Sequence, residues 1–168
     1  MRKTILLFWI FFLSFSGVYA QKFETEVLDE GNTYEVRIKH FNKLFGEEFT
    51  PEKVAELPKD KAMQREKWRE ACADTLLSNE LKQLLKQVVA SDGNGTFWVT
   101  FYTDETGKVL TVKFVMSASF YINIPMKVLR TLFNQAMKEK LVPENYNFDQ
   151  EHTYALDAVE LVTRSLKE

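Results

Sequence analysis

The chain has few cysteines, prolines and histidines for its length. Its 168 residues include one cysteine, Cys72, so an internal disulfide scaffold is excluded. No Pro-rich or Ser-rich linker divides the chain, since its four prolines are isolated, at positions 51, 58, 125 and 143. There are two histidines, His40 and His152, whereas a metal site needs several converging donors. The stability of the fold must therefore come from an apolar core.

Basic residues are neither in excess nor clustered. The formal net charge is -2, and it becomes -4 when Arg2 and Lys3 are removed. Nucleic-acid binding by counterion release needs a face of clustered Lys and Arg, and no segment of this chain supplies one. We therefore expect no nucleic-acid partner.

Residues 1–20 have the pattern of a secretory signal peptide. Arg2 and Lys3 precede an apolar run, Ile5 to Phe15, and small residues follow it. The run is shorter than the ~20 residues that a membrane-spanning helix needs. We expect cleavage after Ala20, no stable membrane span afterwards, and export to the periplasm or the extracellular space. An uncleaved N-terminal anchor is the alternative, whereas a lipoprotein is not expected, because lipid attachment needs a Cys at the cleavage site and Cys72 lies far from it.

The remaining chain, residues 21–168, predicts a single α+β domain. In residues 21–94, Phe23 to Leu28 and Thr33 to Lys39 flank a turn and predict a half-buried hairpin. Thr50-Pro51-Glu52 predicts the start of a short helix. A longer helix is predicted from Asp60 onward, because its apolar residues recur on one face at helical spacing: Trp68, Cys72, Leu77, Leu81, Leu84 and Val88.

Three phenylalanines, Phe41, Phe45 and Phe49, recur every fourth residue after the hairpin. An aromatic recognition stripe is one interpretation. We expect instead that the rings fill the core where the hairpin meets the helices, because large aromatic side chains usually serve burial. Cys72 follows Trp68 by four residues on the predicted helix, so we expect a buried thiol and not a nucleophile.

Residues 95–168 predict a β-β-α-β unit. Strands at Thr96 to Thr103 and Lys108 to Met116 flank Asp104-Glu105-Thr106-Gly107, where Gly107 suits the left-handed position of the turn. A short loop, a helix beginning near Pro125 and a last strand at Thr153 to Thr163 follow. The hairpin and the helix each reverse the chain. We therefore expect the last strand to lie antiparallel to the first, in a sheet with one packed helix.

This hairpin, VTFYTDETGKVLTVKFVMS, and the helix after it resemble the C-terminal domain of TonB-type proteins and of small secreted proteins with that fold. The resemblance covers about the last 70 residues and depends on an apolar alternation and a turn: Val99, Phe101, Asp104, Gly107, Val109, Val112 and Val115, with Leu129, Leu132 and Ala136 in the helix. It implies the fold and an envelope location. It implies no partner-contact residues, because the chain lacks the Pro-rich linker of an energy transducer.

Few residue clusters in the sequence predict chemistry. There is no glycine-rich phosphate loop, no GxSxG and no HExxH, so we predict no cofactor and no enzyme. Asp149 and Glu151 precede His152, and a small hydrolase or metalloenzyme using His40 or His152 is an alternative.

The leading hypothesis is an exported, non-enzymatic module that binds an envelope protein or peptide, by strand addition to a free sheet edge. A membrane-anchored TonB-like transducer component is a further alternative. The sequence predicts no oligomeric state. Four aromatic residues are candidates for partner binding: Trp98, Tyr102, Tyr121 and Tyr146.

Overall fold

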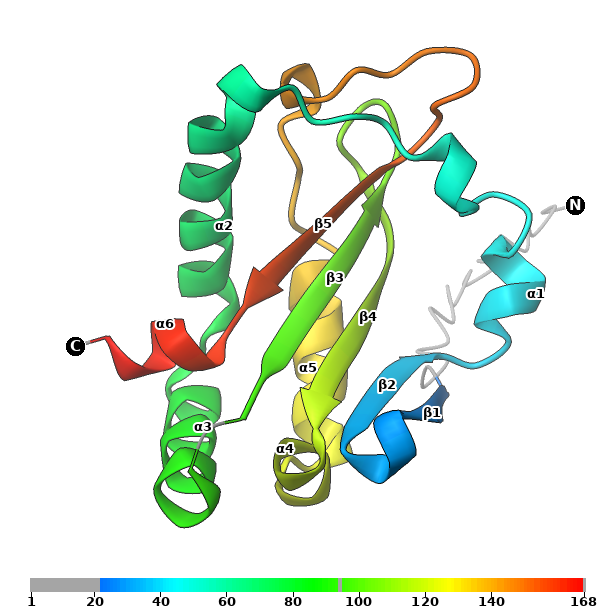
Figure 1. Cartoon of the computed structure of the whole chain (residues 1–168). Helices are drawn as coiled ribbons and strands as arrows, with labels where there is room; N and C mark the ends of the chain where they lie inside the picture. Colours follow the sequence, from blue (N-terminus) through cyan, green and yellow to red (C-terminus); the bar gives the residue numbers. More distant parts are fainter. Residues whose placement is uncertain (1–21, 94, 168) are drawn as a thin grey trace, which may run out of the picture.

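The strands of the molecule form one antiparallel sheet in the order β1-β2-β4-β3-β5 (Figure 1). The computed structural model describes residues 22–93 and 95–167, so the predicted signal peptide, residues 1–20, lies outside the described residues. The strands are β1 Phe23–Leu28, β2 Thr33–Ile38, β3 Phe97–Thr103, β4 Val109–Ser117 and β5 Ala155–Glu160. No helix within the described ranges has both the length and the apolar character needed to cross a bilayer. The predicted α+β fold with an antiparallel sheet is confirmed.

The register of the sheet is set by the two predicted hairpins and by pairings between strands that are distant in the chain. Gly107 has φ +78° and its N–H donates to the Asp104 carbonyl at 2.9 Å, which closes the β3–β4 turn as its sequence predicts. β5 pairs with β3 through Trp98 and Glu160. The N-terminal hairpin joins this sheet because β2 pairs with β4, where Val36 faces Phe114, and it extends the predicted three-stranded unit to five strands.

The long helix predicted from Asp60 is two helices, α2 Ala62–Leu76 and α3 Asn79–Asp92. The prediction of one continuous helix is wrong because Ser78 is an N-cap. Its backbone is extended, and its hydroxyl accepts a hydrogen bond from the Leu81 N–H at 3.2 Å. The buried residues of both helices belong to the main core, so the apolar spacing continues across the break. The short elements before α2 are α1 Phe41–Phe45 and two 3-10 turns, Pro51–Lys53 and Lys59–Lys61.

The C-terminal helices differ from the prediction in two places. The expected loop before Pro125 contains a helix, α4 Ala118–Asn123, and Pro125 then precedes α5 Met126–Ala136. The last strand ends at Glu160 rather than Thr163. The Glu160 carboxylate accepts hydrogen bonds from the N–H groups of Val162 and Thr163, both at 2.8 Å, and so begins α6 Val162–Leu166.

One face of the sheet carries the main core. Phe97, Val99 and Phe101 of β3 are fully buried under α2, α3 and α5, and Figure 1 views the sheet with α5 behind it. Cys72 of α2 is 2% exposed in this core, as predicted. Burial raises the pKa of its thiol, because a thiolate loses its hydration there.

The opposite face of the sheet is covered at one end by aromatic rings. Phe41 and Phe49 pack against Tyr102, which alternates with the core residue Phe101 and so points away from the helices. Tyr154 completes this cluster. The three phenylalanines are therefore buried or half-buried, but not where the hairpin meets the helices. That part of the prediction is wrong because the chain after β2 crosses to the other face.

Candidate functional site

The outer edge of β1 is one of the two ends of the sheet. The Lys39 N–H donates to the Lys22 carbonyl at 2.7 Å, so these two residues form a hydrogen-bonded pair of the β1–β2 ladder. Hydrogen-bonded and non-hydrogen-bonded pairs alternate in an antiparallel ladder. The backbone N–H and C=O groups of Phe23, Thr25 and Val27 therefore point outward, away from β2.

Within the described residues, these outward groups have no backbone partner. Among residues 22–93 and 95–167, β2 is the only strand that pairs with β1. Thr25, Glu26 and Val27 are exposed, and the Val27 side chain is 57% exposed. An exposed row of unpaired backbone groups is a template for strand addition.

A shallow hollow of about 520 Å³ lies beside β1, on the face away from the main core. Its lining combines side chains of β1 and β2 with the residues at the start of α1: Glu24, Thr25, Glu26, Arg37, His40, Asn42 and Lys43. His40 has φ +65°, a left-handed conformation, and its N–H donates to the Glu24 carboxylate at 3.0 Å. This bond ties the turn after β2 to the edge strand.

Arg37 forms ion pairs with the carboxylates on this face of the sheet. Its guanidinium contacts three carboxylates, at 3.0 Å from Glu24, 2.9 Å from Glu26 and 2.7 Å from Glu35. Lys113 is a second cation for Glu35, at 3.3 Å. The hydrogen bonds from the His40 N–H and from Arg37 lower the pKa of Glu24. Glu26 is the outermost of the three carboxylates, and its side chain is 51% exposed.

The other edge strand, β5, is closed by its neighbours. The Tyr154 carbonyl, just before β5, accepts from the Ala55 N–H at 2.7 Å. Further along, α2 packs beside the strand and contributes Arg65 and Arg69 to the carboxylate of Asp157, which is fully buried. The same carboxylate accepts the Ala158 N–H at 2.7 Å, so an outward-facing donor of β5 is already satisfied.

Tyr146 completes the group around Asp157 by donating its hydroxyl to that carboxylate. Burial first, and then the neighbouring Asp157 charge, raise the pKa of the tyrosine, which stays a phenol. Sequence reasoning did not single out Asp157. The available signal was an aspartate at an inward position of the last strand, between Ala155 and Val159.

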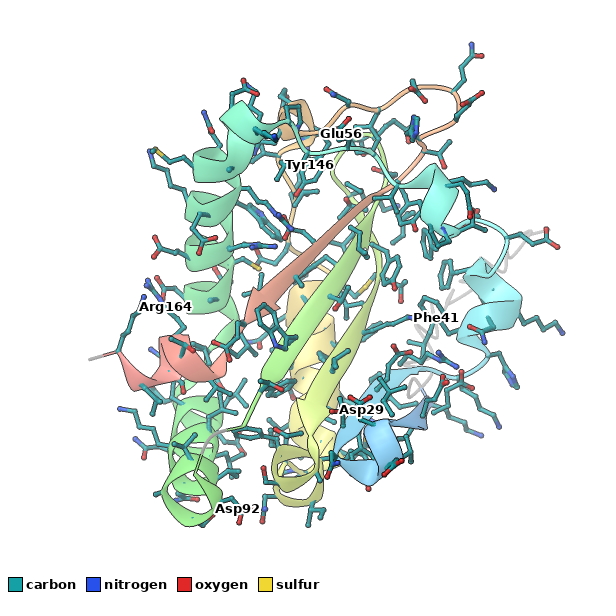
Figure 2. All side chains as sticks on the ribbon, in the orientation of Figure 1. Asp29, Phe41, Glu56, Asp92, Tyr146 and Arg164 are labelled. Carbon is teal, nitrogen blue, oxygen red and sulfur yellow. The ribbon has the colours of Figure 1, made fainter. Side chains whose placement is uncertain are left out.

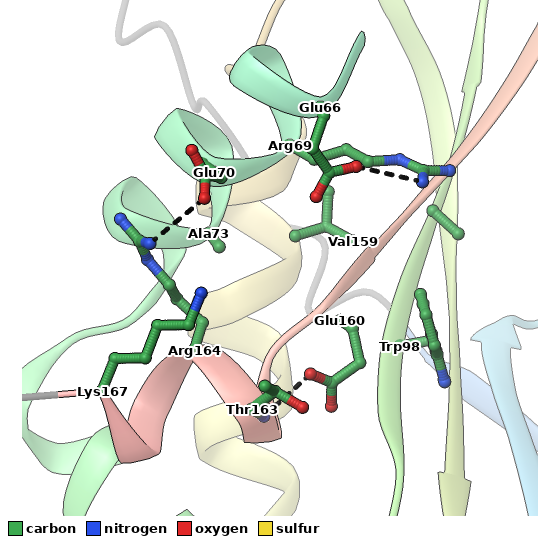
Figure 3. Close-up of a pocket in the computed structure, with 11 residues that line it drawn as sticks. Glu66, Arg69, Glu70, Ala73, Trp98, Val159, Glu160, Thr163, Arg164 and Lys167 are labelled. Atoms are coloured by element: carbon green, nitrogen blue, oxygen red, sulfur yellow. Dashed lines mark hydrogen bonds and ion pairs between the residues drawn. The ribbon is translucent and has the colours of Figure 1, made fainter. Parts of the chain in front are cut away.

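A second cleft, of about 350 Å³, lies between α2, the end of β5 and α6 (Figure 3). Figure 3 shows Glu160 between Trp98 and Thr163, and Glu70 facing Arg164. The charged side chains of its lining are balanced: Glu66, Glu70 and Glu160 against Arg69, Arg164 and Lys167. Its geometry therefore favours neither an anionic nor a cationic ligand.

The four candidate partner-binding aromatics do not form one patch. Tyr102 and Tyr146 are buried, at 9% and 7% exposed, in separate clusters. Figure 2 shows Tyr146 near the start of α2, away from Phe41, which packs on Tyr102. Trp98 lines the second cleft, and Tyr121 stacks on Tyr34 of β2 at 4.2 Å between ring centroids. Only Trp98 and Tyr121 are half-exposed, and their role in binding stays a prediction.

The histidines occupy different parts of the fold. His40 lines the hollow beside β1, whereas His152 lies in the loop before β5 and contacts Asp149 at 2.9 Å. Hydrogen bonds from the backbone and ring of His152 lower the pKa of Asp149 to about 2, and this pairing raises the pKa of His152. Within the described residues, no group of three His, Cys, Asp or Glu side chains is placed to hold a metal ion.

Comparison with known proteins identifies similarity of structure only. No protein-family model matches the chain, and no curated protein matches it. The chain is similar in structure to a DUF5043 family protein from Bacteroides uniformis, whose crystal structure was determined at 1.85 Å resolution. The two are 14% identical, with a TM-score of 0.49, over 83% of this chain and 79% of the other.

Proposed function

We propose that this chain is an exported, non-enzymatic module of the cell envelope that binds a protein or peptide by strand addition to β1. The proposal is based on the difference between the two outer edges of the sheet. The outward backbone groups of β1 have no backbone partner within the described residues, whereas segments 53–55 and α2 close the edge of β5.

The export and envelope parts of this proposal rest on the sequence. Residues 1–20 have the pattern of a signal peptide, and residues 95–168 resemble the TonB-type C-terminal domain. The C-terminal unit has the order β3, β4, α4, α5, β5, which keeps the predicted β-β-α-β succession and adds α4 to it.

Substitution of Thr25 by proline tests the proposal directly. Proline removes the outward N–H of Thr25 and leaves the β1–β2 ladder intact, since an edge strand tolerates proline where its N–H faces solvent. Thr25→Val is the matched control, because both substitutions remove the hydroxyl that accepts from Tyr121 at 3.3 Å. The experiment selects peptides from a random display library on the purified exported protein.

We expect the selected peptides to bind the wild-type protein and the Thr25→Val variant, and to lose at least about tenfold in affinity for Thr25→Pro. Hydrogen exchange should show that the Thr25 and Val27 amides become protected when peptide binds. Equal affinity for the valine and proline variants contradicts the proposal, and so does a selection that recovers no peptide. Thermal unfolding confirms that both variants are folded.

A further inference from the structure

We infer that the cleft between α2, the end of β5 and α6 binds a neutral saccharide of one or two rings. This surface is separate from β1, and binding there does not depend on strand addition. Three properties of the cleft support a saccharide: its size, the pairing of its charges, and an indole ring beside unpaired hydrogen-bonding groups (Figure 3).

The cleft has room for a small molecule and not for a further strand. Its volume of about 350 Å³ lies at the lower end of the range for small-molecule sites, about 300 to 1,000 Å³. Helix α2 packs beside β5, and α6 follows the end of the strand (Figure 3). A strand that paired with β5 here would have to run through the space that α2 occupies, whereas a compact ligand fits between the helices and the strand.

The charged side chains of the lining already have partners inside the protein. Arg69 contacts Asp157 at 2.7 Å, and Arg164 contacts Asp74 at 2.5 Å. The Glu160 carboxylate accepts the N–H groups that begin α6. A charged ligand would compete with these contacts and leave one of the partners uncompensated, so the cleft favours a ligand without net charge.

Backbone groups of β5 open toward this cleft. The Leu161 N–H donates to the Phe97 carbonyl at 2.9 Å, so these two residues form a hydrogen-bonded pair of the β3–β5 ladder. Alternation along the ladder turns the backbone groups of Ala158 and Glu160 outward. The Ala158 N–H is bound by Asp157, but the Ala158 carbonyl and the Glu160 N–H have no partner among residues 22–93 and 95–167. One acceptor and one donor therefore remain on the strand side of the cleft.

An indole ring and a fixed carboxylate lie next to each other in the lining. Trp98 is the cross-strand neighbour of Glu160, and it is the single aromatic residue of the lining, half-exposed. The Glu160 oxygens are held by the N–H groups of Val162 and Thr163, both at 2.8 Å. This arrangement suits a sugar ring, whose C–H groups pack on the indole while neighbouring hydroxyls donate to the two carboxylate oxygens.

Other neutral ligands fit these groups less well. A hydroxyl both donates and accepts, so a saccharide can satisfy the carbonyl, the N–H and the carboxylate together. An apolar ligand would remove the same groups from water without replacing their hydrogen bonds. A nucleoside is the competing neutral ligand, but the lining offers its base one ring to stack on and no second ring to enclose it.

Titration of the isotope-labelled purified protein, followed by NMR, tests the inference. The neutral probes are cellobiose, maltose, lactose and N,N′-diacetylchitobiose. Glucuronic acid and glucosamine are the charged sugars, and adenosine is the nucleoside. Trp98→Phe keeps a flat ring in the cleft, and Trp98→Leu removes it. The matched control is Phe148→Leu, which removes a half-buried aromatic ring outside the lining.

We expect at least one of the four neutral saccharides to bind and to shift the Trp98 indole N–H and the amides of Glu160 and Thr163. Trp98→Leu should weaken this binding at least about tenfold, Trp98→Phe about threefold, and Phe148→Leu not at all.

The inference is overturned if none of the four saccharides binds up to its solubility limit, or if a charged sugar or adenosine binds more tightly than all of them. It is also overturned if Trp98→Leu binds as the wild type does, or if the shifted signals lie outside the cleft. Thermal unfolding confirms that the three variants are folded.

Discussion

The two outermost strands of this sheet, β1 and β5, have the same length and opposite surroundings. Each has six residues and, in the part of the chain that the structure describes, pairs with a single neighbouring strand. β5 lies beside α2 and segment 53–55, and its outward Ala158 N–H is bound by the Asp157 carboxylate. The charged side chains of β1 instead turn onto the face of the sheet, toward Arg37, and no described strand other than β2 pairs with the backbone of β1.

The difference shows that the position of a carboxylate helps to decide whether the backbone edge of an outer strand is covered. Asp157 is buried between β5 and α2, where it closes the edge and couples the strand to the helix. Glu24 and Glu26 stay at the surface, where they stabilise the hairpin without covering it. Loss of the first carboxylate would leave two guanidinium groups without a buried partner, whereas the second arrangement leaves the outward backbone groups of β1 without a strand partner among residues 22–93 and 95–167.

We expect the largest loss of stability from a substitution at the covered edge, β5. Asp157→Asn removes the charge that compensates Arg65 and Arg69 and leaves two guanidinium groups without their buried partner. We expect the free energy of unfolding to fall by about 3 kcal/mol, at the low end for a broken buried ion pair because the arginine side chains are 29% and 25% exposed. Chemical denaturation measures this change.

The matched variant on the open edge is Glu26→Gln. It removes one of three carboxylates that share Arg37 and should change the free energy of unfolding by less than about 1 kcal/mol, as for an exposed ion pair. Equal losses for the Asp157 and Glu26 variants would contradict the comparison. The two measurements use the same denaturant and the same purified protein.

A second test compares proline at one outward N–H of each edge strand. Ala158→Pro removes a donor that is bound to Asp157 at 2.7 Å, and we expect a loss of about 2 kcal/mol for this hydrogen bond to a charged group. Thr25→Pro removes a donor with no backbone acceptor within the described residues, and we expect a loss below about 1 kcal/mol. Denaturation midpoints of the two variants decide between a closed and an open edge.

The sequence predicts the parts of this fold that depend on local patterns. Alternation in β3 and β4 and the left-handed Gly107 predicted the hairpin, and the residue spacing predicted the apolar face of α5. The break at Ser78 was missed because the apolar spacing runs through it unchanged, and only the serine hydroxyl bond marks the cap. Helix α4 was missed because Asn123 and Pro125 resemble the start of a single later helix.

The two edges could not be assigned from the sequence for a different reason. The two arginine partners of Asp157 are 92 and 88 residues away in the chain, so the sequence around Asp157 shows its inward position but not the cations that pair with its carboxylate. The openness of β1 likewise depends on β2 pairing with β4, a contact between strands that are far apart in the chain. Local pattern predicted the strands, and tertiary packing decided which edge was covered.

The smallest expected effect is a pH dependence at the open edge. The His40 N–H and Arg37 lower the pKa of Glu24 below its ordinary value of 4.5. The carboxylate therefore contributes stability above about pH 4.5, and this contribution is lost as the pH falls toward the lowered pKa of the folded protein. Thermal unfolding of wild-type protein and Glu24→Gln between neutral and acid pH measures the contribution.

We expect the wild type to be more stable than Glu24→Gln near neutral pH and the two melting temperatures to converge in acid, because a protonated Glu24 resembles glutamine in charge. The control is Glu144→Gln, which removes an exposed carboxylate in the turn Pro143–Asn145 and leaves β1 unchanged. A gap between wild type and Glu24→Gln that stays constant with pH would show that Glu24 acts through packing alone. The charge on β1 would then not hold the turn after β2 in place, and the hollow beside the open edge would depend on the left-handed backbone of His40 instead.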